Sequence, residues 1–346
     1  MKILIDIGHP AHVHYFKNLM WILKKDGYEF IITARKKSVI EYLLNVYNFE
    51  FKSRGKGRDS VIGKLLYMLR ADIQLLLLAL KKKPDLFLSF SSPYAAQVAW
   101  MMRKPHIAMN DTEHSDANHK IFTYPFSSVI LTPESYKNDL GAKHKRFNSI
   151  VEALYLHDKY FTPDPSIYEY LKIPENTAYV IVRFISWKAH HDYGQSGLNI
   201  ETKRELIRIL SKKYKIFISS EAPLPNEFAP YEIDIPPEKM HDVLNFASIF
   251  IGESGTMASE SAFLGTPSVY INSLPLMCYL DLEEKAGLLK HFRDSEWVVE
   301  FVKSLMDKKD LKVRTLEKKN KMVHEFIDPT LFLVRFIERY INNHES

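Results

Sequence analysis

Short apolar runs alternate along this chain with longer segments in which apolar residues return every three or four positions. Continuous apolar runs are typical of buried parallel strands, and the second spacing is typical of helices with one buried face. Residues 2–7 give the first such strand, residues 8–14 the turn after it, and residues 15–25 the first helix. This alternation predicts an α/β fold with a doubly wound, mostly parallel sheet.

The same alternation continues through the first half of the chain. It predicts further strands at residues 28–34, 85–90, 106–110 and 128–132, and further helices at residues 39–47, 61–82 and 94–102. Residues 52–60 are basic and carry two glycines, so we expect a loop there.

A second α/β set follows a proline-containing stretch without periodicity at residues 157–166, which we interpret as an interdomain linker. The predicted strands of this set are 179–183, 215–220, 231–235, 249–251 and 268–271, and its predicted helices are 201–213, 240–246, 257–264, 281–286, 296–306 and 326–342. We predict neither a helix nor a strand for the basic segment 308–321.

The predicted organisation is therefore two Rossmann-like domains, residues 1–160 and 161–325, followed by a C-terminal helix within residues 326–346. We expect that helix to pack back on the first domain. Two such domains would face one another across a cleft at the carboxyl ends of their strands, where α/β proteins bind ligands.

The stretch Ile249–Asn272 has the clearest pattern for a binding site. It reads as strand, glycine-bearing turn, helix and strand, so Ser254, Gly255 and Thr256 fall at a helix N-terminus, where free N–H groups and the helix dipole favour an anion such as phosphate. Glu260 lies about one turn further along and could accept hydrogen bonds from a ribose. The alternative is that Ser254 and Thr256 only cap the helix and that Glu260 is solvated.

Composition narrows the classes of protein. The single cysteine, Cys278, excludes a disulfide framework and a cysteine-based zinc site and fits a reducing cytosol. The net charge of +5 over 346 residues allows an anionic ligand or membrane surface but does not indicate nucleic-acid binding. The chain opens on a strand and not on a signal peptide, and no apolar run reaches the roughly 18–20 residues of a membrane span. We therefore expect a cytoplasmic protein.

Ionisable residues of the first half cluster in two places. His9, His12 and His14 follow the first strand, and Asp111, Glu113 and His114 follow the strand at 106–110. The three histidines could bind zinc with Asp111 or Glu113, although no second cluster with ligand spacing supports a metal. Packing or helix capping is the alternative for each of these residues.

In the second half, Arg183 and Glu221 each stand at a predicted strand end, and His241 opens a helix. An arginine at that place can hold a diphosphate with two parallel hydrogen bonds, whereas a salt bridge to Glu221 or Glu253 is the less favoured alternative. His190 and His191 lie in the polar loop 184–197 and could reach phosphate or acceptor, with surface exposure as the default.

Several motifs together resemble the GT-B superfamily, which comprises glycosyltransferases and UDP-N-acetylglucosamine 2-epimerases, and more closely the DUF354 family of predicted glycosyltransferases. They are IDIGHPAHVHYFKNL near the start, NDTEH at 110–114, VILTP at 129–133, EALYLH at 152–157, VIVRF at 180–184 and MHDVLNFASIFIGESGTMASESAFLGTP from residue 240. The first motif is also similar, more weakly, to the glycine-histidine turn of the lipid-II-forming N-acetylglucosaminyltransferase, with Pro10-Ala11 where that enzyme has a glycine-rich lead-in.

The resemblance implies a metal-independent glycosyltransferase without a cofactor, acting in cell-envelope polysaccharide synthesis. It would move a sugar from a nucleotide diphosphate donor, with uridine implied by the family alone, to a glycan or lipid-linked acceptor. Inverting transfer needs a base on the acceptor hydroxyl, for which His12 is the first choice, with His9 and His14 as rivals and Asp111 or Glu113 as an orienting or alternative carboxylate.

Two other functions stay open: a UDP-N-acetylglucosamine 2-epimerase, although the chain reads VRFISW around Arg183 where those epimerases carry a His-Arg-Arg-Glu context, and a non-catalytic nucleotide-sugar-binding protein. The leucine-rich helix at 61–82 also has two interpretations. Core packing is favoured, and a peripheral membrane face at the inner surface is the alternative because lysines flank the leucines.

Overall fold

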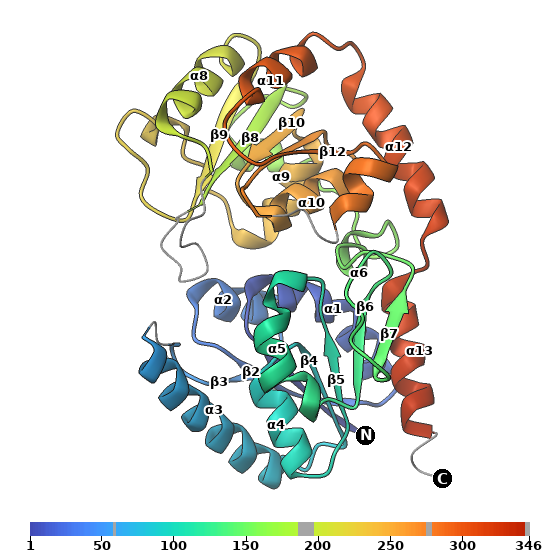
Figure 1. Ribbon diagram of the computed structural model, residues 1–346. Coiled ribbons are helices and arrows are strands. Elements are labelled where there is room, and N and C mark those ends of the chain that lie inside the picture. Colours follow the sequence, from blue (N-terminus) through green and yellow to red (C-terminus); the bar gives the residue numbers. More distant parts are fainter. Residues whose placement is uncertain (58–59, 186–196, 275–278, 343–346) are drawn as a thin grey trace. The chain divides into compact units, whose positions relative to one another are not determined.

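The computed structural model describes residues 1–57, 60–185, 197–274 and 279–342 (Figure 1). The chain divides into two compact units, and the polypeptide passes from one to the other twice. Unit 1 comprises residues 1–160 and 327–346, and unit 2 comprises residues 161–326.

Unit 1 contains a seven-stranded sheet in the order β3-β2-β1-β4-β5-β6-β7, in which every pairing is parallel. The strands are β1 (Lys2–Ile7), β2 (Glu29–Ala34), β3 (Phe51–Ser53), β4 (Leu86–Phe90), β5 (His106–Met109), β6 (Val129–Pro133) and β7 (His144–Phe147). Its helices include α1 (Pro10–Lys25), α2 (Ser38–Val46), α3 (Val61–Lys82), α4 (Pro93–Met101), α5 (Asp116–Phe122), α6 (Ala153–Leu156) and α13 (Pro329–Asn342). The strand order reverses between β1 and β4, because β2 and β3 continue to one side and β5 to β7 to the other.

Unit 2 repeats the design with a five-stranded parallel sheet in the order β12-β11-β10-β8-β9. The strands are β8 (Tyr179–Phe184), β9 (Lys215–Ser220), β10 (Ile249–Gly252), β11 (Ser268–Ile271) and β12 (Leu289–Phe292). Its helices include α7 (Ile167–Tyr170), α8 (Ile200–Leu210), α9 (Met240–Phe246), α10 (Gly255–Phe263), α11 (Val298–Met306) and α12 (Leu311–Glu325). Here the order reverses between β8 and β10.

The central strands of both sheets are buried on their two faces, as continuous apolar strands require. Residues 3–7 of β1 and 249–252 of β10 are buried throughout. In unit 2 the strands pack against α8 and α11 through a core that includes Val180, Leu206 and Val302. The predicted α/β, doubly wound class is confirmed.

The last helix packs on the first unit, as expected. α13 contacts α1 and α6, and Leu333 and Ile337 are fully buried. The Thr330 hydroxyl donates to the Leu154 carbonyl at 2.8 Å, and the backbone N–H of Ile327 donates to the Asn148 carbonyl at 3.0 Å. Helix α13 is therefore an integral part of the N-terminal unit.

Four local predictions were wrong. The predicted turn at 8–14 is shorter, because Pro10 begins α1, and the predicted loop at 52–60 contains strand β3. Residues 231–235 are not a strand, since only an isolated bridge joins Glu232 to Ile218. The basic segment 308–321 is mostly helix α12. Within the described residues, no helix combines the length and the apolar character needed to cross a bilayer.

Candidate functional site

The carboxyl ends of β1 and β4 form the switch point of unit 1, the place where open α/β sheets bind ligands. Two helices begin there, and each has proline in its first turn. His9 caps α1 by accepting a hydrogen bond from the N–H of Ala11 at 3.3 Å, and Ser92 caps α4 by accepting one from Ala95 at 3.4 Å. The dipoles of both helices thus direct positive ends toward this edge of the sheet.

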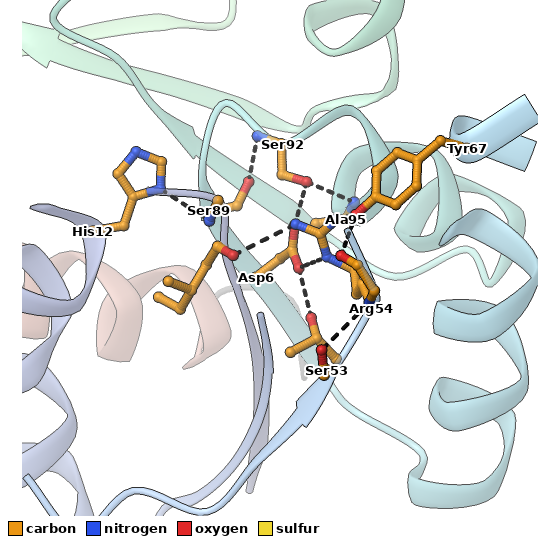
Figure 2. A network of polar contacts seen from close by, with 12 residues as sticks. Asp6, His12, Ser53, Arg54, Tyr67, Ser89, Ser92 and Ala95 are labelled. Atoms are coloured by element: carbon orange, nitrogen blue, oxygen red, sulfur yellow. Dashed lines mark hydrogen bonds and ion pairs between the residues drawn. The ribbon is translucent and has the colours of Figure 1, made fainter. Parts of the chain in front are cut away.

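His12 lies in the first turn of α1, beside this edge (Figure 2). Its Nδ1 accepts a hydrogen bond from the N–H of Gly8 at 3.3 Å, and its ring packs 4.9 Å from the ring of Phe90. Burial, then the neighbouring His9 and Arg54, hold the pKa of His12 well below its usual range. The ring is therefore neutral at pH 7, with its proton on Nε2, so that Nε2 is a hydrogen-bond donor.

The other two histidines of the motif point to different surroundings. His14 is buried, with Nδ1 3.4 Å from the Tyr47 hydroxyl and its ring stacked on Tyr155, so it belongs to the core and not with His12. His9 is exposed, and its ring centroid lies 5.8 Å from that of His12. Across the part of the chain that the structure describes, no set of three or more His, Cys, Asp or Glu side chains is placed to hold a metal ion.

A buried polar network under the switch point was missed by the sequence analysis (Figure 2). Asp6 Oδ1 accepts hydrogen bonds from Thr33 Oγ1 and Arg54 Nε, both at 2.6 Å, and Asp6 Oδ2 accepts one from Ser92 Oγ at 2.5 Å. Arg54 also donates to the Tyr67 hydroxyl at 2.9 Å. Asp6 and Arg54 are almost completely buried, so the segment assigned to a loop supplies a buried cation. Asp6, the one charged residue among the buried positions of β1, was the available signal.

The two carboxylates of the cluster after β5 accept hydrogen bonds from a neighbouring residue and from the segment after β6. Asp111 accepts from the Thr112 hydroxyl at 2.6 Å, and Glu113 Oε1 accepts from the N–H of Lys137 at 2.8 Å. Both carboxyls are buried, and burial raises the pKa of each. The second oxygen of Glu113 has no hydrogen-bond partner among the described residues, whereas His114 is exposed.

Asp116, which the sequence analysis did not select, is the centre of this region. Its Oδ1 accepts hydrogen bonds from the hydroxyls of Tyr124 and Tyr136, and its Oδ2 accepts one from the Asn138 amide at 2.9 Å. These bonds fix the segment after β5 against the segment after β6. Asp111 and Glu113 consequently have defined positions at the same sheet edge as the end of β4.

The switch point of unit 2 lies at the ends of β8 and β10. Gly252 is required there, because a Cβ atom would lie 2.6 Å from the Cβ of Arg183. The next residue, Glu253, is fully buried and accepts hydrogen bonds from the N–H groups of Ile185 at 3.0 Å and Leu198 at 2.8 Å. One carboxylate therefore fixes the chain both where it leaves β8 and where it approaches α8.

Arg183 makes the contact that the sequence analysis considered less favoured. Its Nη2 lies 2.8 Å from Glu221 Oε1, and its Nη1 donates to Ser219 Oγ at 2.8 Å. The Nε–H of Arg183 is buried and has no hydrogen-bond partner within the described residues. Burial lowers the pKa of Arg183, and the carboxylates of Glu221, Glu253 and Glu260 act in the opposite direction.

Helix α10 begins next to this arginine's strand. Ser254 caps it by accepting a hydrogen bond from Met257 N–H at 3.4 Å. The capping considered as the alternative is thus present for Ser254, whereas Gly255 and Thr256 lie in the first turn. Glu260 is not solvated: its side chain is buried, and its Oε1 lies 3.1 Å from Nε2 of His241. The structure thus pairs Arg183 with Glu221 and His241 with Glu260. His190 and His191 lie outside the described residues.

Solved structures with the same fold include an epimerase and a rhamnosyltransferase. A UDP-GlcNAc 2-epimerase from Neisseria meningitidis, bound to UDP-GlcNAc, has a TM-score of 0.72 at 12% identity, over 98% of this chain and 100% of that one. The spinosyn rhamnosyltransferase SpnG, complexed with thymidine diphosphate, has a TM-score of 0.62 at 14% identity, again over 98% and 100%. The predicted GT-B fold with two Rossmann-like domains is confirmed.

Relatives in sequence extend over nearly the whole chain. An uncharacterized protein of Methanocaldococcus jannaschii, MJ0665, is 25% identical over 325 residues, which cover 89% of this chain and 93% of that protein. The model of the family described as "Protein of unknown function (DUF354)" matches residues 1–331. By this match, and in agreement with the resemblance of its motifs, the chain belongs to the DUF354 family.

Proposed function

We propose that this protein is a glycosyltransferase that moves a sugar from a nucleotide diphosphate donor to a glycan or lipid-linked acceptor. The observation that carries the proposal is the arrangement around Arg183. Arg183 stands at the switch point of unit 2, and its buried Nε–H has no hydrogen-bond partner among the described residues. It pairs with Gly252, which precedes the turn that opens α10. This is the arrangement of charge and N–H donors that a diphosphate requires.

The donor side of the proposal uses the residues of unit 2. Arg183 and the N–H groups of Ser254, Gly255 and Thr256 hold the diphosphate, and Glu260, fixed by His241, accepts from the ribose. Glu221 is the carboxylate that gives way to the phosphate. A uridine donor is supported by the motif resemblance and by the UDP-GlcNAc bound in the neisserial epimerase. Since arginine and a helix dipole neutralise the leaving diphosphate, the proposal needs no metal ion.

The acceptor side uses unit 1, where His12, Asp111 and Glu113 are the proposed catalytic residues. In the free protein, His12 is a hydrogen-bond donor and not a base, because a neutral ring that accepts from Gly8 at Nδ1 carries its proton on Nε2. To act as the base, His12 must exchange that tautomer on substrate binding. Asp111 or Glu113, whose raised pKa values make them stronger bases than ordinary carboxylates, are the alternative proton acceptors.

An epimerase remains the second candidate, since the neisserial epimerase shares the fold at the TM-score given above. That reaction inverts C2 of the sugar without an acceptor. The context VRFISW around Arg183 differs from the His-Arg-Arg-Glu context of the resembling epimerases, which favours transfer. A cytoplasmic site of action in cell-envelope polysaccharide synthesis, next to the inner face of the membrane, completes the proposal. A protein that only binds nucleotide sugars is the third candidate.

One experiment separates these three. The purified protein is incubated with UDP-, GDP-, CMP- and dTDP-sugars, each with and without a panel of glycan and lipid-linked acceptors, and followed by NMR. Acceptor-dependent nucleotide release is the expected result. Epimer formation without acceptor would replace transfer by isomerisation, and binding without turnover on any acceptor would leave a binding protein. Repeating the productive reaction in EDTA, with unchanged rate expected, tests the absence of a metal.

A further inference from the structure

Helix α3 carries a continuous apolar stripe on its exposed side. Five residues of this stripe are each between 54% and 63% exposed: Leu66, Leu69, Ile73, Leu77 and Leu80. Their spacing of three and four residues places them on one face of the helix, and Figure 1 shows α3 on the outer side of its unit. The expectation of core packing was therefore wrong for these residues.

The opposite face of the same helix is the one that serves the core. Tyr67, Ala71, Leu75 and Ala79 are buried, again at a spacing of four, and Leu75 and Ala79 belong to a cluster with Leu4 and Phe87 of the sheet. Helix α3 is thus apolar on two sides. Core packing explains the first side only, and an exposed apolar face of this extent indicates an interaction surface.

The charged residues beside the exposed stripe indicate which kind of partner the stripe binds. Arg70 follows Leu66 by four residues, and Lys81 follows Leu77 by four, so both basic residues border the stripe along the same edge. Lys82 and Lys83 extend the positive charge beyond the last turn. The helix contains one acid, Asp72, and its buried Oδ1 lies on the side of the Arg54 and Asp6 network.

We propose that the stripe of α3 docks on an anionic lipid bilayer, with its leucines in the interface and Arg70 and Lys81 at the lipid phosphates. The stripe of a second copy of this chain offers no acidic residue to Arg70 and Lys81, because the one acid of α3, Asp72, lies on the other side of the helix. A bilayer with anionic lipids offers apolar depth and negative charge together. This proposal rests on the proposed function in one respect only: a transferase docked on the bilayer would reach a lipid-linked acceptor at the bilayer surface.

The test is flotation of the full-length protein with vesicles of phosphatidylcholine alone or mixed with phosphatidylglycerol, without any sugar donor. The protein should float with the mixed vesicles and much less with phosphatidylcholine alone, and salt should weaken the binding. The double variant Leu69→Gln/Leu77→Gln should lose about tenfold or more in vesicle affinity. Arg70→Gln/Lys81→Gln should abolish the preference for anionic lipid.

Val313→Gln is the control for replacing an exposed apolar residue outside the stripe, since Val313 is 56% exposed on α12 and its replacement should leave vesicle binding unchanged. Circular dichroism and thermal melting show that each variant is folded. Failure of the wild type to float, or flotation of Leu69→Gln/Leu77→Gln like the wild type, overturns the proposal. So does a wild-type dimer that this variant converts to monomer in analytical ultracentrifugation while vesicle binding persists.

The two proposals fail separately. Transfer to a water-soluble acceptor should be the same for Leu69→Gln/Leu77→Gln as for the wild type, because neither leucine belongs to the proposed catalytic or donor site. Absence of transfer with intact vesicle binding would remove the proposed function and keep the docking surface. Absence of vesicle binding with intact transfer would do the reverse.

Discussion

Arg183 and Glu221 are joined through Nη2 and Oε1 at 2.8 Å, although Arg183 lies on β8, Glu221 follows the neighbouring strand β9, and Glu221 is half exposed. A diphosphate at Arg183 must compete with this carboxylate. We therefore expect Glu221→Gln to bind a UDP-sugar more tightly, by about threefold to tenfold, and Arg183→Gln to bind it at least tenfold more weakly. Isothermal titration calorimetry measures both. Equal affinity of Arg183→Gln and wild type would remove Arg183 from the donor site.

The His241–Glu260 pair gives a second prediction for donor binding. Glu260→Ala should weaken UDP-sugar binding before it affects any later step, since Glu260 is proposed to hold the ribose. Because Glu260 is buried against His241, His241→Gln serves as the comparison that disturbs the pair but keeps the carboxylate. A 2′-deoxy donor should bind Glu260→Ala and wild type alike. Unchanged affinity of Glu260→Ala for the normal donor would show that the ribose lies elsewhere.

Substitutions of His12 distinguish a hydrogen-bond donor from a general base at this position. His12→Ala should abolish turnover and keep donor binding. His12→Gln offers an amide N–H near the position of Nε2–H, so it should retain part of the activity if the ring acts as a hydrogen-bond donor and none if it acts as the base. Since the pKa of His12 is lowered, neither role should produce an inflection in kcat/KM near pH 6.5 from this residue. Imidazole 15N shifts report the tautomer directly.

The buried pair of Asp6 and Arg54 should be critical for the stability of unit 1. Asp6→Asn leaves a buried guanidinium without its counter-charge, and we expect a loss of about 3–5 kcal/mol in the free energy of unfolding. Asp6→Asn/Arg54→Met removes both charges and should be more stable than Asp6→Asn alone. Urea unfolding of the three proteins checks the order. Additive losses in the double variant would mean that the two side chains are not coupled.

His106 provides a pH dependence with a definite sign. It is buried between the hydroxyls of Ser89 and Ser127, each 2.9 Å from one ring nitrogen, and burial lowers its pKa to about 3. The unfolded state, with a histidine pKa of about 6.5, then binds more protons between pH 6.5 and pH 3, so stability is present above pH 6.5 and is lost as the pH falls through this window. The loss amounts to about 4–5 kcal/mol at its limit.

The variant His106→Gln isolates that contribution. The difference in unfolding free energy between wild type and variant should shrink as the pH falls from 7 to 4, because the variant has no proton to bind at this position. Urea unfolding at a series of pH values measures it. A constant difference across the series would show that His106 titrates normally in the folded protein.

Among the strands, the sequence predicted those that are continuous apolar runs and missed the short edge strands that are not. Strands β1, β8 and β10 are continuous apolar runs, and their bounds were placed to within a residue or two. Strand β7 reads HKRF and β12 reads LKHF, so neither carries an apolar signal; each is recognised only by its parallel partner at the sheet edge. Residues 231–235 have an alternating pattern, but the prolines at 230, 236 and 237 limit its pairing to one bridge.

Helix α12 shows why the basic segment was not recognised. Its buried residues are Thr315, Lys319 and Met322, which have helical spacing but include one apolar side chain only.

The sequence also predicted only part of the candidate site. Residue type and strand ends brought out Arg183, Glu221 and His12, and the Arg183–Glu221 pair was named as the less favoured alternative. The Asp6–Arg54 pair was missed because it depends on the strand order β3-β2-β1, which is fixed by tertiary packing.

Helix α13 has a consequence for the order in which the protein is made. It follows the whole of unit 2 along the chain and so leaves the ribosome after that unit, yet it packs on α1, the helix that carries His12. Unit 2, residues 161–326, is complete before α13 is synthesised, so it can fold while unit 1 still lacks one of its helices. Unit 1 therefore becomes complete only after unit 2, and a chain released between residue 326 and α13 would have a whole unit 2 and a unit 1 that lacks the helix packed on α1.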